Sequence, residues 1–147
     1  MFGYKKVLAI LKDRYDEYLK EYDECETKLD PYRFEKIISN YDVISVVLKL
    51  EIPDDAVVVM PDDAYFFPRE PIKHRCSKAM PVSAAVVHSD IHGSLLLDNY
   101  VLFSRYDPHF TYEIGKMAIP DDFDTNHRHV CSHGIHFFET ADDAINY

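Results

Sequence analysis

The densest group of chemically capable side chains lies between His127 and His136. Four of the eight histidines and one of the three cysteines fall within this segment. Alternate residues of an extended strand face the same side, so four of these side chains would share one face of a strand. Imidazole and thiolate are ligands that suit tetrahedral zinc. The segment therefore offers four candidate zinc ligands, which are His127, His129, Cys131 and His133.

Two arguments limit this zinc site. Side chains two residues apart on a strand are separated by roughly 6.5 Å, so three of them on one ion would strain its coordination. The Cys-x-x-Cys spacing of many structural zinc sites is absent from the sequence. We therefore expect a polar loop that leads into a strand, with no bound metal or cofactor. A structural zinc module stays as an alternative.

A cysteine nucleophile is a second option, at Cys76 or Cys131. His74, Arg75 and Lys78 lie close to Cys76 in the sequence, and nearby cations lower the pKa of a thiol. The base that activates a nucleophile normally arrives from elsewhere in the fold, however. A single cysteine is more commonly a buried and inert thiol. The sequence therefore favours a protein without catalytic residues.

A short basic patch in an acidic chain is the third candidate. Lysine and arginine total 16 against 26 aspartate and glutamate residues, which gives a net charge of −10 with histidine neutral. Against this background, basic side chains gather between residues 69 and 78. An arginine there would hold a phosphate or carboxylate through two parallel hydrogen bonds. The candidate contacts to a small anionic ligand are Arg75, Lys78, Tyr112, Cys131 and His136.

Charge and hydropathy exclude several classes of partner. A net charge of −10 repels a phosphate backbone and disfavours nucleic-acid binding. No stretch approaches the ~18 apolar residues that cross a membrane, and the apolar run at residues 7–11 is shorter than that of a signal peptide. Three cysteines, an odd number, indicate reduced thiols and hence a cytoplasmic protein. The sequence carries no indication of the oligomeric state.

The elements that position these residues follow from the hydrophobic pattern. Between residues 8 and 22, apolar side chains recur every three or four positions, which predicts an amphipathic helix. Asp30 and Pro31 are typical of the start of a second helix. A tyrosine stripe on the first helix is either core or a docking surface for a partner protein. Residues 8–41 are thus expected to form a helical hairpin, unless residues 2–9 form a strand.

From residue 42 onward the pattern is that of strands. Runs rich in β-branched residues and bounded by proline or turn residues predict strands. Thr140 is expected to cap a last helix that runs to Tyr147. The expected strands are residues 2–9, 42–52, 82–87, 95–104, 112–114 and 135–138, with a loop at 61–71 and a turn at 90–93.

Six segments occur in an order that resembles a known domain: 48–53, 75–79, 112–116, 120–124, 131–138 and 143–147. Together they resemble an uncharacterised domain of phages, some bacteria and large DNA viruses, sometimes attached to pentapeptide repeats. The most specific part is the Cys-Ser-x-Gly-Ile-His-Phe-Phe string at residues 131–138. That family tends to open with a Tyr-Lys strand, which Tyr4 and Lys5 match. The resemblance therefore implies a strand at residues 2–9 and a helical insertion at about residues 13–41.

Residues 134–147 carry a second, shorter resemblance. They are similar to the Gly-Ile-Tyr-Phe strand and the following helix of ADP-ribosyltransferases. In those enzymes the aromatic residue at the third position stacks on nicotinamide, and His136 stands at that position here. This resemblance implies a nucleotide-using enzyme that relies on His136 and Cys131.

We therefore predict one α+β domain over residues 1–147, with a mixed or antiparallel sheet. An N-terminal helical hairpin packs on one face of the sheet and a short helix closes the chain. The expected function is that of a small viral or phage accessory protein in the host cytoplasm. It would act by binding a host protein or a small anionic ligand, not by catalysis. The ligand would lie in a small positive hollow between the segments around residues 76 and 134.

Overall fold

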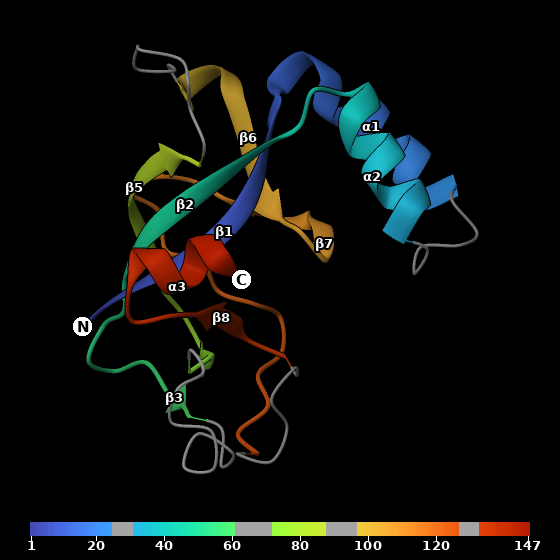
Figure 1. Ribbon diagram of the computed structural model, residues 1–147. Coiled ribbons are helices and arrows are strands. Elements are labelled where there is room, and N and C mark those ends of the chain that lie inside the picture. Colours follow the sequence, from blue (N-terminus) through green and yellow to red (C-terminus); the bar gives the residue numbers. More distant parts are fainter. Residues whose placement is uncertain (25–30, 61–71, 88–96, 127–132) are drawn as a thin grey trace. The chain divides into compact units, whose positions relative to one another are not determined.

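A computed structural model describes residues 1–24, 31–60, 72–87, 97–126 and 133–147 of the chain (Figure 1). It has mixed helix and strand content, so the predicted α+β class is confirmed. The helices are α1 (Lys12–Glu24), α2 (Pro31–Asn40) and α3 (Ala141–Asn146), with a short 3-10 helix η2 (Leu97–Asn99). The strands are β1 (Phe2–Leu11), β2 (Ile44–Glu51), β3 (Val58–Val59), β4 (His74–Cys76), β5 (Met80–Val86), β6 (Tyr100–Ser104), β7 (Asp107–Tyr112) and β8 (Ile135–Phe137).

The strands form two sheets. Strand order is β5-β2-β1-β6-β7 in the five-stranded sheet and β3-β4-β8 in the three-stranded sheet. The pairs β1–β6, β6–β7, β3–β4 and β4–β8 are all antiparallel, one of the two arrangements predicted for the sheet. Among the described residues, no helix combines the length and the apolar character needed to cross a membrane.

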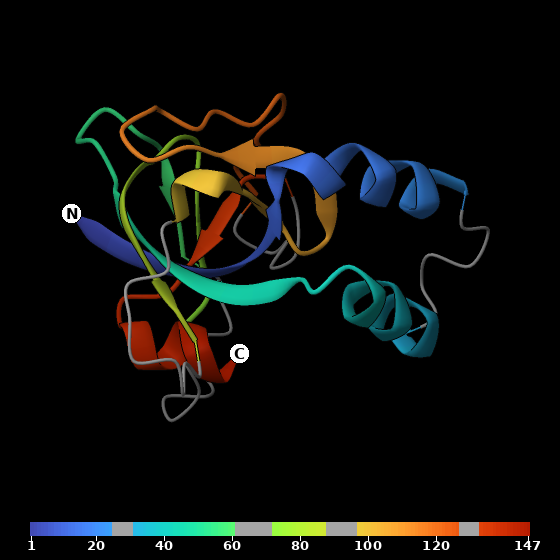
Figure 2. The same ribbon diagram turned by 90° about the horizontal axis from the view of Figure 1, so that it is seen from above.

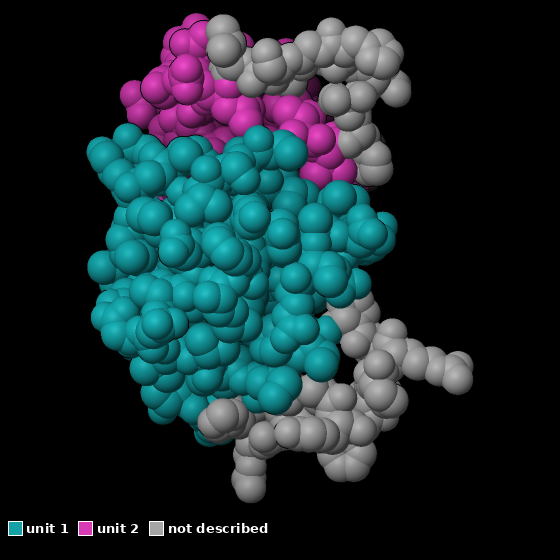
Figure 3. Space-filling view, turned by 90° about the vertical axis from the view of Figure 1, so that its left-hand side faces the viewer, with its two compact units in different colours: residues 1–6, 47–85, 113–147 teal, residues 7–46, 86–112 magenta. Residues whose placement is uncertain are grey.

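The chain divides into two compact units, which Figure 3 colours separately. Unit 1 comprises residues 1–6, 47–85 and 113–147, and unit 2 comprises residues 7–46 and 86–112. The N-terminal half of β1 thus belongs to unit 1 and its C-terminal half to unit 2. Each unit is described below by itself, and the expectation of one domain over all 147 residues stays a prediction.

The core of unit 2 explains why its helices form. Tyr18 of α1 is 1% exposed and contacts two other buried rings. Its ring centroid lies 5.3 Å from that of Phe103 on β6 and 5.6 Å from that of Tyr41, which follows α2. Helices α1 and α2 lie side by side (Figures 1 and 2). Full burial of one such ring contributes ~1.5–3 kcal/mol, so the tyrosine stripe stabilises the core.

In unit 1, strands β4 and β8 pair and the start of β1 joins them. Tyr4 and Phe138 exchange two backbone hydrogen bonds, each of 2.8 Å. Thr140 caps α3 as predicted, because its hydroxyl accepts a hydrogen bond from the backbone N–H of Asp143 at 3.2 Å. Phe138 also packs against Tyr147, with ring centroids 5.2 Å apart.

Several element boundaries differ from the prediction. Residues 97–99 form η2, so the strand expected from residue 95 begins only at Tyr100. The strand expected at residues 112–114 lies earlier, because β7 begins at Asp107 and ends at Tyr112. Strand β4 was not predicted at all. The loop at 61–71 and the turn at 90–93 lie outside the described residues.

Candidate functional site

The structure brings the segments around residues 76 and 134 together within unit 1. In the antiparallel pair β4–β8, Cys76 lies opposite Ile135 and Arg75 lies opposite His136. Two of the predicted ligand contacts, Arg75 and His136, are therefore cross-strand neighbours. The small positive hollow expected between them stays a prediction.

Arg75 acts as a scaffold in this region. It is 1% exposed, and its guanidinium lies over the ring of Phe123, 5.6 Å from the ring centroid. Nη1 donates hydrogen bonds to the carbonyl oxygens of Asp124 at 2.6 Å and His133 at 2.8 Å, and Nη2 donates to that of Asn126 at 3.0 Å. These bonds tie two chain segments to β4. They also use donors that a bound anion would need.

The other predicted site residues have diverse surroundings. Lys78 forms an ion pair with Asp55, and its hydrogen bond holds the pKa of that carboxyl below its usual value. His136 is half-buried, and its backbone carbonyl accepts a hydrogen bond from Lys5. Tyr112 ends β7 in unit 2, where its ring contacts that of Phe110. Of the candidate zinc ligands, His127, His129 and Cys131 lie outside the described residues, and His133 is exposed.

His74 is the most unusual side chain of unit 1, and the sequence analysis considered it only as a basic neighbour of Cys76 and as part of the basic patch. It is 4% exposed and stacks on Phe137, with ring centroids 5.2 Å apart. Neither ring nitrogen makes a hydrogen bond within the described residues, although Nε2 lies 3.3 Å from Oε1 of Glu139. Burial lowers the pKa of His74, and the Glu139 carboxylate opposes this shift. Burial therefore favours the neutral imidazole, and neither ring nitrogen has a hydrogen-bond partner among the described residues.

Lys5 is the second residue that sequence reasoning missed. Its Nζ donates a hydrogen bond to the carbonyl oxygen of His136 at 3.1 Å. Burial, and then the positive charge of Lys73, lower the pKa of Lys5 to about 8. The pKa of the nearby Cys76 thiol shifts in the opposite direction, because burial raises it to about 12. The reactive thiolate considered for Cys76 is therefore disfavoured, because the burial effect exceeds that of the nearby cations.

Lys73 completes the group. Its Nζ donates a hydrogen bond of 2.6 Å to the hydroxyl of Tyr147 and lies 4.6 Å from the centroid of that ring. We refer to Lys5, Lys73, His74, Cys76 and Glu139 as the His74 cluster. The two ammonium groups and the imidazole of the cluster are suited to an anion that accepts hydrogen bonds, and the Glu139 carboxylate, 3.3 Å from Nε2 of His74, opposes it. Within the described part of the chain, no three histidine, cysteine, aspartate or glutamate side chains are arranged so that they could hold a metal ion.

Alternation along a strand was the signal that could have identified this cluster. His74 and Cys76 are two residues apart, so on a strand they share a face. Their cross-strand neighbours Phe137 and Ile135 are apolar and buried, which indicates an apolar face for β4. The sequence alone does not reveal β4, because three residues are too few for a periodicity.

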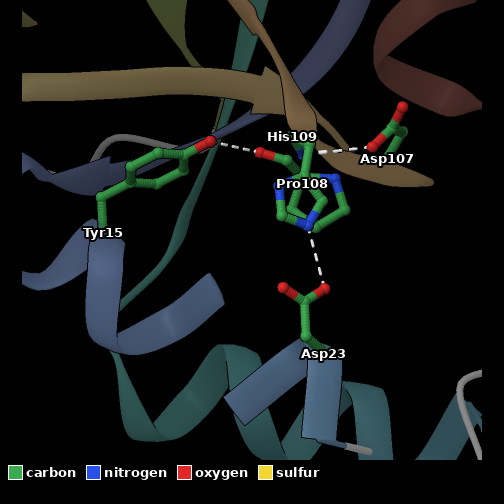
Figure 4. Close-up of polar contacts among 5 residues, drawn as sticks. All are labelled: Tyr15, Asp23, Asp107, Pro108 and His109. Atoms are coloured by element: carbon green, nitrogen blue, oxygen red, sulfur yellow. Dashed lines mark hydrogen bonds and ion pairs between the residues drawn. The ribbon is translucent and has the colours of Figure 1, made fainter. Parts of the chain in front are cut away.

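Unit 2 has a separate group of polar contacts, between α1 and β7 (Figure 4). The hydroxyl of Tyr15 donates a hydrogen bond of 2.5 Å to the carbonyl oxygen of Pro108. Nε2 of His109 lies 2.9 Å from Oδ1 of Asp23, and the backbone N–H of His109 donates to Oδ1 of Asp107 at 3.1 Å. His109 and Asp23 are about half exposed. These contacts hold the helix on the strand.

Comparison with known proteins supports the predicted resemblance to a viral domain. The chain is 31% identical over 147 residues to the uncharacterized protein L223 of Acanthamoeba polyphaga mimivirus, covering 97% of this chain and 89% of that relative. It is 28% identical over 123 residues to protein L227 of the same virus, covering 80% of this chain and 71% of that relative. No solved structure matches the chain.

A family model fixes the assignment. Residues 1–144 match the model of a family of unknown function, DUF5758. The expected likeness to an uncharacterised domain of large DNA viruses is thus confirmed. The Cys-Ser-x-Gly-Ile-His-Phe-Phe string as the mark of that family, and its attachment to pentapeptide repeats, stay predictions. The chain belongs to the DUF5758 family.

Proposed function

We propose that this protein acts by binding a small anionic ligand at the His74 cluster of unit 1. One observation carries the proposal: the buried imidazole of His74 has no hydrogen-bond partner at either ring nitrogen among the described residues. Lys73 precedes it directly in the chain. A buried polar atom without a hydrogen-bond partner costs ~1–3 kcal/mol, and a ligand that accepts a hydrogen bond from His74 would recover part of that cost.

Charge supports an anion over a neutral ligand. Lys73 and Lys5 are close enough for the charge of Lys73 to lower the pKa of Lys5. A phosphate or carboxylate near both ammonium groups would relieve this repulsion. The chain as a whole is acidic, with a net charge of −10. An anion would therefore be repelled elsewhere on the surface and attracted to these ammonium groups.

Thermal unfolding with inorganic phosphate tests the proposal. Phosphate at about 100 times its Kd stabilises a protein by ~2.7 kcal/mol, which raises the Tm of a chain of this size by roughly 5–10 °C. We expect this rise in the wild type at constant ionic strength. Lys73→Gln should reduce it, whereas Lys116→Gln, which removes an exposed charge paired with Glu113, should not. An equal rise in both variants, or none in the wild type, would contradict the proposal.

Docking of a host protein on the tyrosine-bearing helices has less support. Tyr18 is buried, and the hydroxyl of Tyr15 donates a hydrogen bond to the carbonyl oxygen of Pro108. Both side chains therefore make their contacts within unit 2. The ligand site we infer needs no partner protein. Cys76 is a buried free thiol, which fits the reducing host cytoplasm that we propose as its location.

A further inference from the structure

An exposed apolar segment of unit 1 follows β7 in the chain. Ile114, Met117 and Ile119 are 45%, 42% and 62% exposed, although all three side chains are large and apolar. A single exposed apolar residue is ordinary on a protein surface, whereas several together commonly mark a site of protein association. The segment is therefore a candidate interaction surface.

Backbone hydrogen bonds hold this segment in place. The N–H of Lys116 donates to the carbonyl oxygen of Glu113 at 3.1 Å and closes a turn, in which Gly115 supplies the positive φ of 85°. Ala118 and Ala79 exchange two backbone hydrogen bonds, of 2.8 and 3.1 Å. The exposed apolar side chains therefore extend from an ordered backbone, which reduces the entropy that a partner must lose on binding them.

A second exposed apolar segment lies close to the first. Val57 and Val58, where β3 begins, are 48% and 36% exposed. The carbonyl oxygen of Val57 accepts a hydrogen bond of 2.9 Å from the N–H of Ser77, and Ala118 pairs with Ala79. Two residues of chain span at most ~7 Å, so both apolar segments border the same short stretch, residues 77–79. We refer to the exposed apolar residues of both segments as the Ile119 surface, which comprises Val57, Val58, Ile114, Met117 and Ile119.

Acidic side chains flank both parts of the Ile119 surface. The sequence Pro-Asp-Asp occurs at residues 53–55, just before one segment, and at residues 120–122, directly after the other. The aspartates of both copies are exposed. The lysines of these stretches, Lys78 and Lys116, each form an ion pair with a carboxylate of the same stretches. The charge around the surface is therefore negative overall.

We propose that the Ile119 surface docks a protein segment in which apolar side chains are flanked by lysine or arginine. The apolar side chains of that segment would remove the exposed isoleucine, methionine and valine side chains from water, and its cations would pair with the aspartates of the two Pro-Asp-Asp copies. A second copy of this chain is a poorer occupant, because a symmetric contact would place the same aspartates against one another. The inference goes beyond the proposed function, since no residue of the His74 cluster takes part.

A synthetic peptide with a central run of valine and isoleucine and with lysines at both ends is the probe. Its binding to the folded full chain is measured at low salt by the fluorescence anisotropy of the labelled peptide. We expect saturable binding, and Ile119→Ser should raise the Kd at least ~5-fold, because an exposed anchor is lost. Tyr106→Ser, which removes a 72% exposed ring of unit 2, is the matched control and should leave the Kd unchanged. Met117→Ser is a second apolar variant for use if Ile119→Ser lowers the Tm of the protein.

A pair of charge variants tests the role of the aspartates. Asp54→Asn combined with Asp121→Asn removes one charge from each Pro-Asp-Asp copy, and it should weaken binding and reduce its dependence on salt. Asp13→Asn combined with Asp16→Asn makes the same change of charge on α1 and should have a smaller effect.

Four results would overturn the inference. They are no saturable binding of the lysine peptide, equal Kd values for Ile119→Ser and Tyr106→Ser, equal effects of the two pairs of charge variants, and equal binding of a peptide with glutamate in place of lysine. Sedimentation of the protein alone tests the other occupant, and we expect a monomer. A dimer that Ile119→Ser dissociates would assign the surface to a second copy of this chain and reject the basic segment.

Discussion

At the scale of single residues, Gly3 sets how closely β1 approaches β8. A Cβ atom at Gly3 would lie 2.4 Å from Cδ2 of Phe137, closer than real Cβ atoms come to other heavy atoms. Phe137 is fully buried and stacks on His74. The ring therefore cannot move aside without moving the imidazole of the candidate site.

We expect Gly3→Ala to destabilise the protein by ~1–3 kcal/mol, the usual cost of an overpacked core. The free energy of unfolding in urea measures this effect. Adding Phe137→Leu should recover part of the loss, because a smaller side chain leaves room for the new methyl group. Additive losses in the double variant would show that the two positions do not compete for the same space.

At the scale of elements, two contacts of different character hold α1 on β7. Tyr15 is half-buried, and burial is the largest cause of its raised pKa, followed by the charge of Asp107. Its hydrogen bond to Pro108 joins two neutral groups. Asp23 and His109 are about half exposed, and they form an ion pair only when the His109 ring is protonated. Salt should therefore distinguish the two contacts.

We expect Tyr15→Phe to destabilise the protein by ~1 kcal/mol at low and high salt alike. Asp23→Asn should cost less, ~0.5 kcal/mol, and only at low salt, because exposed ion pairs are weak and screened. Urea unfolding with and without 1 M NaCl, roughly seven times physiological ionic strength, measures both. A salt-dependent effect of Tyr15→Phe would mean that the hydroxyl acts through charge.

The long elements could be predicted from the sequence because their patterns repeat over several turns or residues. Helix α2 begins at Pro31 and β2 ends before Pro53, as proline predicts at both positions. Strand β7 was misplaced because it begins with Asp107 and Pro108, residues typical of a turn. Strand β4 was hidden because two of its three residues are basic.

The site could be predicted only in outline, since its chemistry depends on which side chains are buried. Arg75 is one of the predicted ligand contacts, but its guanidinium bonds to backbone carbonyls that no sequence pattern indicates. Lys5 was read as part of a strand, and nothing in its neighbours along the chain signals that its amine faces His136. Contacts between residues more than a hundred positions apart carry no local signal.

At the scale of the whole molecule, the buried cationic groups make stability depend on pH. The pKa of Lys5 is lowered from 10.5 to about 8 in the folded protein. Between these values the unfolded chain binds more protons than the folded one, so stability rises with pH. Cys76 acts with the opposite sign above pH 9, because burial raises the pKa of its thiol. Tyr18 and Tyr41 do so above pH 10, since their pKa values are raised to about 12.

These opposing signs leave a window between pH 8 and 9 in which Lys5 dominates among the shifted groups. We expect the free energy of unfolding to rise there by at most about 1 kcal/mol, with the partial exposure of Lys5 reducing the effect. Urea unfolding at roughly half-unit steps of pH, at about pH 8.0, 8.5 and 9.0, measures this rise in the free energy of unfolding. Lys5→Met should abolish the rise, because the unfolded variant has no proton to retain at this position. If the variant keeps the full rise, the amine of Lys5 has an ordinary pKa and its burial does not affect its charge.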